Sequence, residues 1–133
     1  MQPYHEAQEY TAPDLEAGLV AAVRASPDLY WEALDLLPTN AADAFTVHVD
    51  AWEELARAIE ANAPLPAVDG QVAPAPAPLE AARTLGELYQ KRALAQIHQE
   101  ALRRLRDGDP VADLVEALEV GLAAVQEAIA ATR

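Results

Sequence analysis

Two of the three histidines of this chain are candidates for chemistry, and their surroundings decide what each could do. His5 stands close to Glu6 and Glu9, a combination that could bind a metal ion, but it belongs to a polar stretch, residues 1–13, that we interpret as a flexible lead-in. His48 occupies one position of an apolar pattern with helical spacing, and no second histidine lies at helical spacing from it. We therefore interpret His48 as a hydrogen-bonded core residue rather than as a base or a metal ligand.

The charged clusters are equally unspecific. Glu53 and Glu54 lie on a helix face that we expect to be solvated. The only basic cluster is Arg103, Arg104 and Arg106, in the last turns of an expected helix, where cations are favoured by the helix dipole; a phosphate site is the second interpretation. The sequence has no glycine-rich phosphate loop, no Gly-x-Ser-x-Gly elbow and no His-Glu-x-x-His motif. It therefore predicts no catalytic residue, no cofactor and no metal.

Charge and composition limit the classes of partner and the cellular compartment that we expect for this chain. The net charge is −13, of which residues 1–70 carry −11, and the chain has one Lys and eight Arg. Nucleic-acid binding depends on Lys and Arg that neutralise phosphates, so we expect no direct contact with nucleic acid. No apolar run approaches the roughly 20 residues of a membrane span. The lack of cysteine and of a signal-peptide pattern favours the cytoplasm.

The elements that would position these residues are helices, and the strongest signal covers residues 79–133. Two long helical patterns there are separated by Asp107-Gly108-Asp109-Pro110, in which Gly108 suits the end of a helix and Pro110 the start of one. So short a break predicts antiparallel arms. We expect the apolar stripes of the arms to face each other: Leu85, Leu88, Leu94, Ile97, Ala101 and Leu105 on the first arm, and Val111, Leu114, Leu118, Leu122, Val125 and Ile129 on the second.

The preceding half of the chain predicts a small helical bundle over residues 14–62, with helices over 14–24, 29–37 and 42–62. The Pro/Ala-rich residues 63–78 favour an extended, semi-rigid connector; recognition by a proline-binding module is the alternative. The expected fold is thus all-α: a small helical bundle followed by a long antiparallel helical hairpin in a single domain. We expect the core to include Leu19, Val23, Leu34, Phe45, Trp52, Leu55 and Leu118.

The hairpin is longer than a compact core needs. Arms of about 28 and 22 residues would reach ~42 and ~33 Å. Flanking apolar and small residues would be left in water unless a second chain covers them, so we predict a homo-oligomer built from a dimer of hairpins across a two-fold axis. The alternative is a hairpin that folds back fully on its own bundle. The residues predicted for self-association are Ala93, Ala101, Leu102, Val115, Gly121, Ala124 and Ala128.

The order of segments resembles a known family, the N-terminal domain of DnaB-type replicative helicases. The stretch from Pro13 to Val23, followed by Ser26-Pro27-Asp28, is similar to the opening of that domain. An aromatic residue, a histidine, an apolar helix and a proline turn of the family have counterparts here, and so does its closing hairpin. The counterparts are Phe45, His48, Trp52, Leu55 and Pro64-Leu65, and then Lys91-Arg92-Ala93-Leu94 through Gly108-Asp109 to Leu114 and Leu118-Glu119.

The resemblance implies a function that is not catalytic. Such a domain forms the collar of a hexameric ring, supports ring assembly through paired hairpins, and docks the primase or a helicase loader. The ATPase motor lies in a separate downstream domain, so the chain would be a fragment of a helicase or a motorless relative; its end in a helical pattern favours a fragment. Two further hypotheses are the helicase-binding domain of a primase and an unrelated acidic helical regulator that binds a basic partner.

Overall fold

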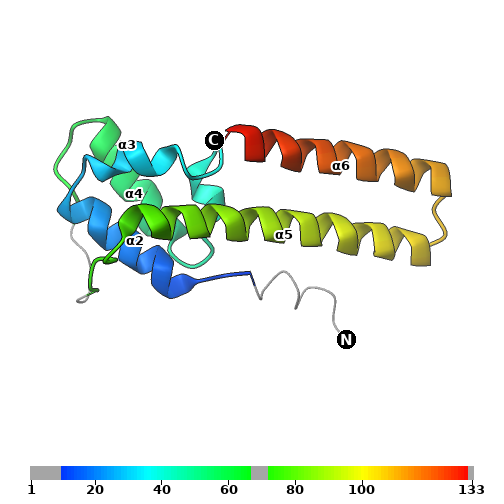
Figure 1. Ribbon diagram of the computed structural model, residues 1–133, viewed down its shortest axis with the longest axis horizontal. Helices are drawn as coiled ribbons and strands as arrows, with labels where there is room; N and C mark the ends of the chain where they lie inside the picture. The colour runs from blue at the N-terminus through cyan, green and yellow to red at the C-terminus, as the bar shows by residue number, and fades with distance from the viewer. Residues whose placement is uncertain (1–9, 67–71, 132–133) are drawn as a thin grey trace.

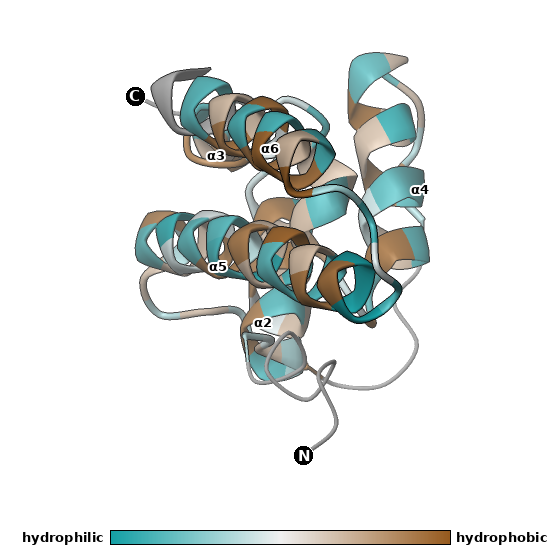
Figure 2. Ribbon diagram, turned by 90° about the vertical axis from the view of Figure 1, so that its right-hand side faces the viewer, coloured by the Kyte–Doolittle hydropathy of each residue, from teal (hydrophilic) through white to brown (hydrophobic). Residues whose placement is uncertain are grey.

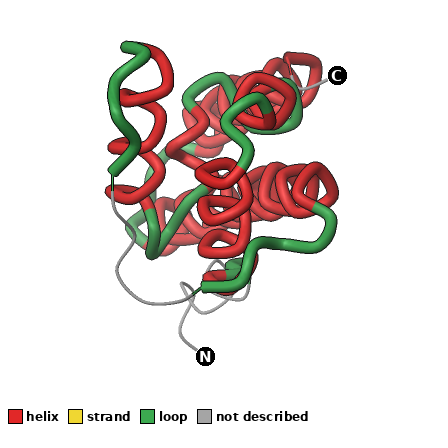
Figure 3. The backbone as a smooth tube through the Cα atoms, turned by 90° about the vertical axis from the view of Figure 1, so that its left-hand side faces the viewer, coloured by secondary structure: helices red, strands yellow, loops and turns green. Residues whose placement is uncertain are grey.

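The fold is all-α. The computed structural model describes residues 10–66 and 72–131, and within these ranges it contains helices and no strand (Figures 1 and 3). The acids and the histidine of the predicted lead-in, His5, Glu6 and Glu9, lie outside the described residues. The helices are α2 (Pro13–Ala25), α3 (Leu29–Leu34), the 3-10 helix η1 (Ala41–Ala44), α4 (Val49–Glu60), α5 (Pro78–Arg106) and α6 (Val111–Ala131).

Local sequence signals explain where two of the helices begin. Both α2 and α5 start at a proline, Pro13 and Pro78, whose missing N–H has no partner to lose in the first turn. The first turn of α2 is acidic and its last turn contains Arg24, so both ends complement the helix dipole. The described parts of the connector then run against α2. Arg24 Nε donates to the carbonyl oxygen of Pro66 (2.7 Å), and the Ala75 N–H donates to the carbonyl oxygen of Gly18 (3.0 Å).

The core is built around stacked aromatic rings. The rings of Phe45 and Trp52 are stacked with their centroids 4.8 Å apart, and the Tyr30 ring lies 5.6 Å from Trp52. Aliphatic side chains from four segments surround them, and the most completely buried are Leu19, Val23, Leu37, Leu55 and Leu85. The core thus draws on α2, α3, η1, α4 and the N-terminal part of α5.

Helix α5 belongs to both halves of the molecule. Helices α2 and α3 and the 3-10 helix η1 pack on it, and α6 packs along it in the antiparallel sense (Figure 1). Viewed along the arms, α4 stands at a steep angle to α5 and α6 (Figure 2). Arg92 ties α5 to the other half, because its guanidinium donates to the carbonyl oxygens of Tyr10 (2.6 Å) and Asp43 (3.1 Å). The bundle therefore lies at one end of α5, and the α5–α6 hairpin extends from the other end.

The helix predicted over residues 42–62 is broken, and a buried carboxylate explains why. Glu16 of α2 is fully buried. Its Oε1 accepts the backbone N–H groups of Thr46 (2.9 Å), Val47 (3.0 Å) and His48 (3.0 Å), and its Oε2 accepts the Thr46 hydroxyl (2.6 Å). A continuous helix would use those N–H groups internally and leave a buried charge unpartnered. The chain forms η1, an extended residue at Phe45 and then α4 instead.

Three other predictions on the bundle need correction. His48 is half-buried at the start of α4, where its backbone N–H, rather than its place in an apolar stripe, connects it to the core. The second helix ends at Leu34 rather than at Leu37, and turns follow. Leu34 and Leu118 are half-buried: Leu34 packs on the edge of the core, and Leu118 lies in the hairpin, apart from it. The other predicted core residues, Leu19, Val23, Phe45, Trp52 and Leu55, are buried in the core.

Candidate functional site in the α5–α6 hairpin

The turn between the arms is closed by backbone bonds and one ion pair. Gly108 has φ +85°, a conformation that glycine adopts without steric cost, and its N–H donates to the carbonyl oxygen of Leu105 (3.2 Å). The N–H of Asp109 donates to the carbonyl oxygen of Arg104 (3.1 Å), while Arg104 Nε donates to the Asp109 carboxylate (2.7 Å). Pro110 stands one residue before α6 and accepts the N–H of Leu114 (3.2 Å). These bonds fix the direction in which α6 returns.

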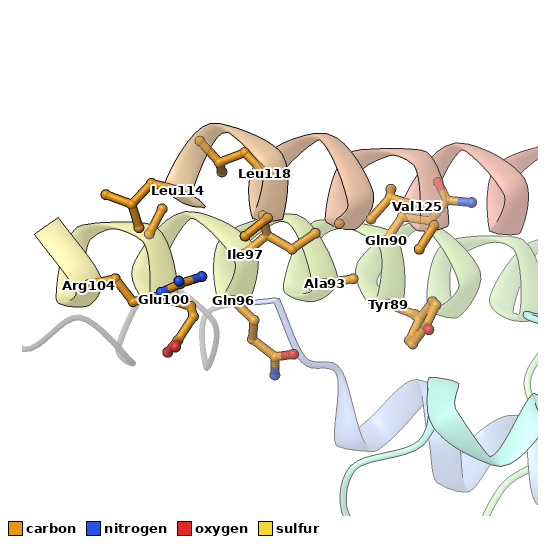
Figure 4. Close-up of a pocket in the computed structure, with 14 residues that line it drawn as sticks. Tyr89, Gln90, Ala93, Gln96, Ile97, Glu100, Arg104, Leu114, Leu118 and Val125 are labelled. Atoms are coloured by element: carbon orange, nitrogen blue, oxygen red, sulfur yellow. The ribbon is translucent and has the colours of Figure 1, made fainter. Parts of the chain in front are cut away.

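A small residue sets the spacing between the arms. A Cβ atom added to Gly121 of α6 would lie 3.2 Å from the side chain of Ile97 on α5, so the two helices approach closely at this point. Leu114 is buried nearer the turn, and Figure 4 shows Ile97 and Val125 in the space between the arms. Gly121, one of the residues predicted for self-association, therefore allows close packing within the hairpin itself.

A largely apolar groove of about 420 Å³ runs along one side of the hairpin. Four of the residues predicted for self-association line it: Ala93, Ala101, Gly121 and Ala124. Figure 4 shows Gln96 and Glu100 of α5 pointing away from α6 at the open side of this groove. The remaining lining residues are Tyr89, Gln90, Ile97, Arg104, Leu114, Ala117, Leu118 and Val125. We call this surface the groove.

A second apolar surface lies on the other flank of the hairpin. In the described part of the chain ten large apolar side chains are exposed, and seven of them belong to the hairpin. Helical spacing of 100° per residue puts three on one side of α5 and three on one side of α6, and the antiparallel direction of the arms brings both sets to the same flank. We call this surface the leucine face: Leu94, Leu102, Leu105, Val111, Val115 and Leu122.

The predicted set of interface residues is therefore divided between two surfaces. Leu102 and Val115 belong to the leucine face, whereas Ala93, Ala101, Gly121 and Ala124 belong to the groove; the side chain of Ala128 lies outside the described residues. The stripes predicted to close the hairpin were partly wrong. Four of their members are exposed by 42% or more instead of lying between the arms, namely Leu94, Leu105, Val111 and Leu122.

Charges on the hairpin are paired on α5 and unbalanced on α6. Arg103 forms ion pairs with Glu100 and Asp107, and its hydrogen bonds lower the pKa of Glu100 below its usual value. Arg104 pairs with Asp109 at the turn. In contrast, residues 111–131 contain four acids and no base. The basic cluster noted in the sequence is thus largely occupied by local partners, which weakens the phosphate interpretation.

Polar contacts in the bundle hold the fold together. Burial raises the pKa of Glu16, but the hydrogen bonds from the Thr46 hydroxyl and from three backbone N–H groups outweigh it, so that the pKa of Glu16 lies below its usual value. Burial and the bond from the Tyr30 hydroxyl to Glu60 (2.5 Å) raise the pKa of Tyr30. Each group has a structural partner: Glu16 is held by four donors of residues 46–48, and Tyr30 donates to the Glu60 carboxylate.

Comparison with known proteins adds no assignment. No family model, no curated protein and no solved structure matches this chain. Within the described residues, no helix combines the length and the apolar character needed to cross a membrane. The same part of the chain contains no group of three or more acidic or histidine side chains that could hold a metal ion.

Proposed function

We propose that this chain is a non-catalytic assembly and docking module that self-associates through the leucine face of its hairpin. One observation carries the proposal: of the ten large apolar side chains that are exposed among the described residues, seven lie on the hairpin, and six of these share one flank. A single exposed leucine is ordinary on a protein surface, but a contiguous apolar patch costs free energy in water unless a partner covers it.

The size of the leucine face sets the expected strength of association. Leu94 to Leu105 and Val111 to Leu122 each span eleven residue steps, or ~17 Å, and two adjacent helices are ~20 Å wide. Stable interfaces bury ~800 Å² on each partner, which is more than this patch supplies by itself. We therefore expect a reversible dimer that forms at tens of micromolar and needs neighbouring contacts to become permanent.

In its specific form, the proposal is that the module is the collar domain of a DnaB-type replicative helicase in the cytoplasm. It would support ring assembly and dock a primase or a helicase loader. The support is the arrangement of the molecule, a small bundle with a protruding hairpin, which is the arrangement that the sequence resemblance implies. Reading the gene beyond codon 133 tests this form: a phosphate loop of a helicase motor in the same frame would favour it, and a different domain would oppose it.

Light scattering with paired variants tests the self-association itself. Val115 of the leucine face and Val120, which is 66% exposed on the other flank of α6, are each changed to Lys. For the unmodified chain and for Val120→Lys, we expect the molar mass measured by light scattering to rise with concentration. For Val115→Lys, we expect it to stay at the value of the monomer. A monomer at every concentration for the unmodified chain, or equal loss of mass in the two variants, would contradict the proposal.

A further inference from the structure

We propose that the groove is a docking site for a basic amphipathic helix of another protein. The inference goes beyond the proposed self-association, because it concerns the opposite flank of the hairpin and a different partner. It rests on the shape of the groove, the small residues of its α6 wall and the charges that flank it.

The dimensions of the groove match a helix. It extends along α5 from Tyr89 to Arg104, fifteen residue steps or ~22 Å, which is about four helical turns. Its α6 wall contains Ala117, Gly121 and Ala124, side chains short enough for a helix axis to approach within about 8–10 Å. A helix that fills this groove must supply the large side chains itself, so its buried stripe should consist of Leu, Ile, Met or Phe.

The charges beside the groove determine the rest of the partner. Asp113 stands four residues before Ala117, and Glu127 three residues after Ala124, so both exposed carboxylates lie along the α6 wall. No base on α6 within residues 111–131 opposes them. On the α5 side, Arg104 is bound to Asp109, and Glu100 shares Arg103 with Asp107. Lys and Arg on the flanks of a docked helix would meet Asp113 and Glu127, whereas acidic flanks would be repelled.

The same charges argue against a second copy in the groove. A copy that presented its α6 would bring four acids toward Asp113 and Glu127. A copy that presented its α5 would offer Arg103 and Arg104, both of which already pair with carboxylates of their own hairpin.

The test uses the full chain and a labelled synthetic peptide of about 15 residues. The peptide carries leucines at helical spacing and lysines on both flanks; the comparison peptide keeps the leucines and replaces each lysine by glutamate. Fluorescence anisotropy at low ionic strength should show saturable binding of the lysine peptide that weakens with added salt. Absence of saturable binding, or equal affinity for the glutamate peptide, would overturn the proposal.

Matched variants locate the binding. Ala124→Leu fills the groove, and Ala123→Leu adds the same side chain to the exposed far side of α6. We expect the first to weaken the affinity for the lysine peptide about tenfold and the second to leave it within about twofold. The double charge reversal Asp113→Lys with Glu127→Lys should weaken it as well, whereas Glu119→Lys, on the other flank of α6, should not. Equal effects within either pair would overturn the proposal.

Light scattering on the Ala124→Leu variant separates this inference from the proposed function. If the groove binds a second copy instead of a basic helix, this variant loses oligomer mass, and the proposal fails. If it binds a partner helix, the variant keeps the oligomer mass of the unmodified chain and loses only the peptide. Val115→Lys should show the opposite behaviour, with intact peptide binding and lost mass. If the peptide binds a chain that is monomeric at every concentration, the groove proposal stands and the proposed self-association is wrong.

Discussion

The two ends of α5 show how differently one helix can be used. At the bundle end, Ala81, Ala82 and Leu85 are buried among side chains from three other segments, and Gly86 touches the backbone of the chain that follows α3. At the hairpin end, Leu94 and Leu105 are about half exposed, although leucine is as apolar there as in the bundle. The bundle buries the apolar side chains of this helix, whereas the hairpin leaves them exposed to water.

This difference also appears in the polar contacts. The bundle uses a fully buried carboxylate with four donors, whereas the hairpin uses ion pairs between exposed side chains. Buried hydrogen bonds to a charge are worth more than exposed ion pairs, which water and salt screen. Stability should therefore be concentrated at one end of α5 and binding at the other. Substitutions matched between the two ends can test that division.

The largest contrast is expected from removing side chains. Trp52→Ala deletes the centre of the aromatic stack and should lower the free energy of unfolding by about 3–5 kcal/mol. Leu105→Ala in the hairpin should change it by less than about 0.5 kcal/mol. Urea denaturation followed by circular dichroism, at concentrations below self-association, measures both. A loss below about 1 kcal/mol for Trp52→Ala would show that the stack does not hold the bundle together.

The next contrast uses pH. Because the pKa of Glu16 is lowered in the folded chain, its stabilising effect is present above its usual value of 4.5 and is lost as the pH falls through the lowered folded-state value. Glu16→Gln should cost about 1.5–3 kcal/mol at neutral pH and flatten the fall in stability on acidification. Denaturation at a series of pH values checks this. An unchanged acid dependence would mean that other carboxylates are responsible for it.

A third contrast places the same substitution at two glycines, one at the bundle end of α5 and one in the hairpin. A Cβ atom at Gly86 would lie 2.5 Å from the carbonyl oxygen of Leu36, a backbone atom that cannot rotate away, so Gly86→Ala should cost about 1–3 kcal/mol. At Gly121 the neighbours are side-chain carbons of Ile97 at 3.2 Å or more, and a shift of a few tenths of an ångström between the arms relieves the contact. The better helix propensity of alanine offsets this cost, so the change should stay within about 0.5 kcal/mol. Melting temperatures of the two variants should differ clearly; equal values would contradict the difference in rigidity.

The smallest effect is expected at the exposed ion pairs near the turn. Arg103→Ala removes the partner of Glu100 and Asp107. Exposed pairs contribute little and are screened by salt, so the melting temperature should remain unchanged within error. A clear fall in melting temperature that disappears at high salt would show that the turn stabilises the hairpin more than its exposure suggests.

The helices of this fold were predictable because their signals are local. Gly108 and Pro110 mark the turn, and Pro13 and Pro78 mark two helix starts. The break before α4 was not predictable in this way, because Glu16 lies thirty residues away from Thr46. A signal was present nonetheless: Glu16 stands at helical spacing with Leu19, Val20 and Val23, so an acid occupied a position of the buried stripe.

The faces of the hairpin were harder to predict than its existence. Both arms carry apolar residues over more than half of their circumference, so periodicity alone does not select the inward side. The bundle makes that selection, since Leu85 and Gly86 fix the rotation of α5 and thereby decide that Ile97 points inward and Leu94 outward. The chemistry of the interface was visible in the sequence, but its division between the groove and the leucine face depended on packing elsewhere.

Because α5 runs without a break from the bundle into the hairpin, an insertion in this helix would rotate the hairpin relative to the bundle. One residue inserted into α5 beyond Arg92 would advance the hairpin tip by ~1.5 Å and turn it by ~100° about the helix axis. The bundle would be unchanged, yet the leucine face would point in a new direction. Insertions of about seven or eleven residues come close to whole turns and would preserve the orientation of both surfaces. We therefore expect related chains to differ in the length of α5 by steps of about seven or eleven residues.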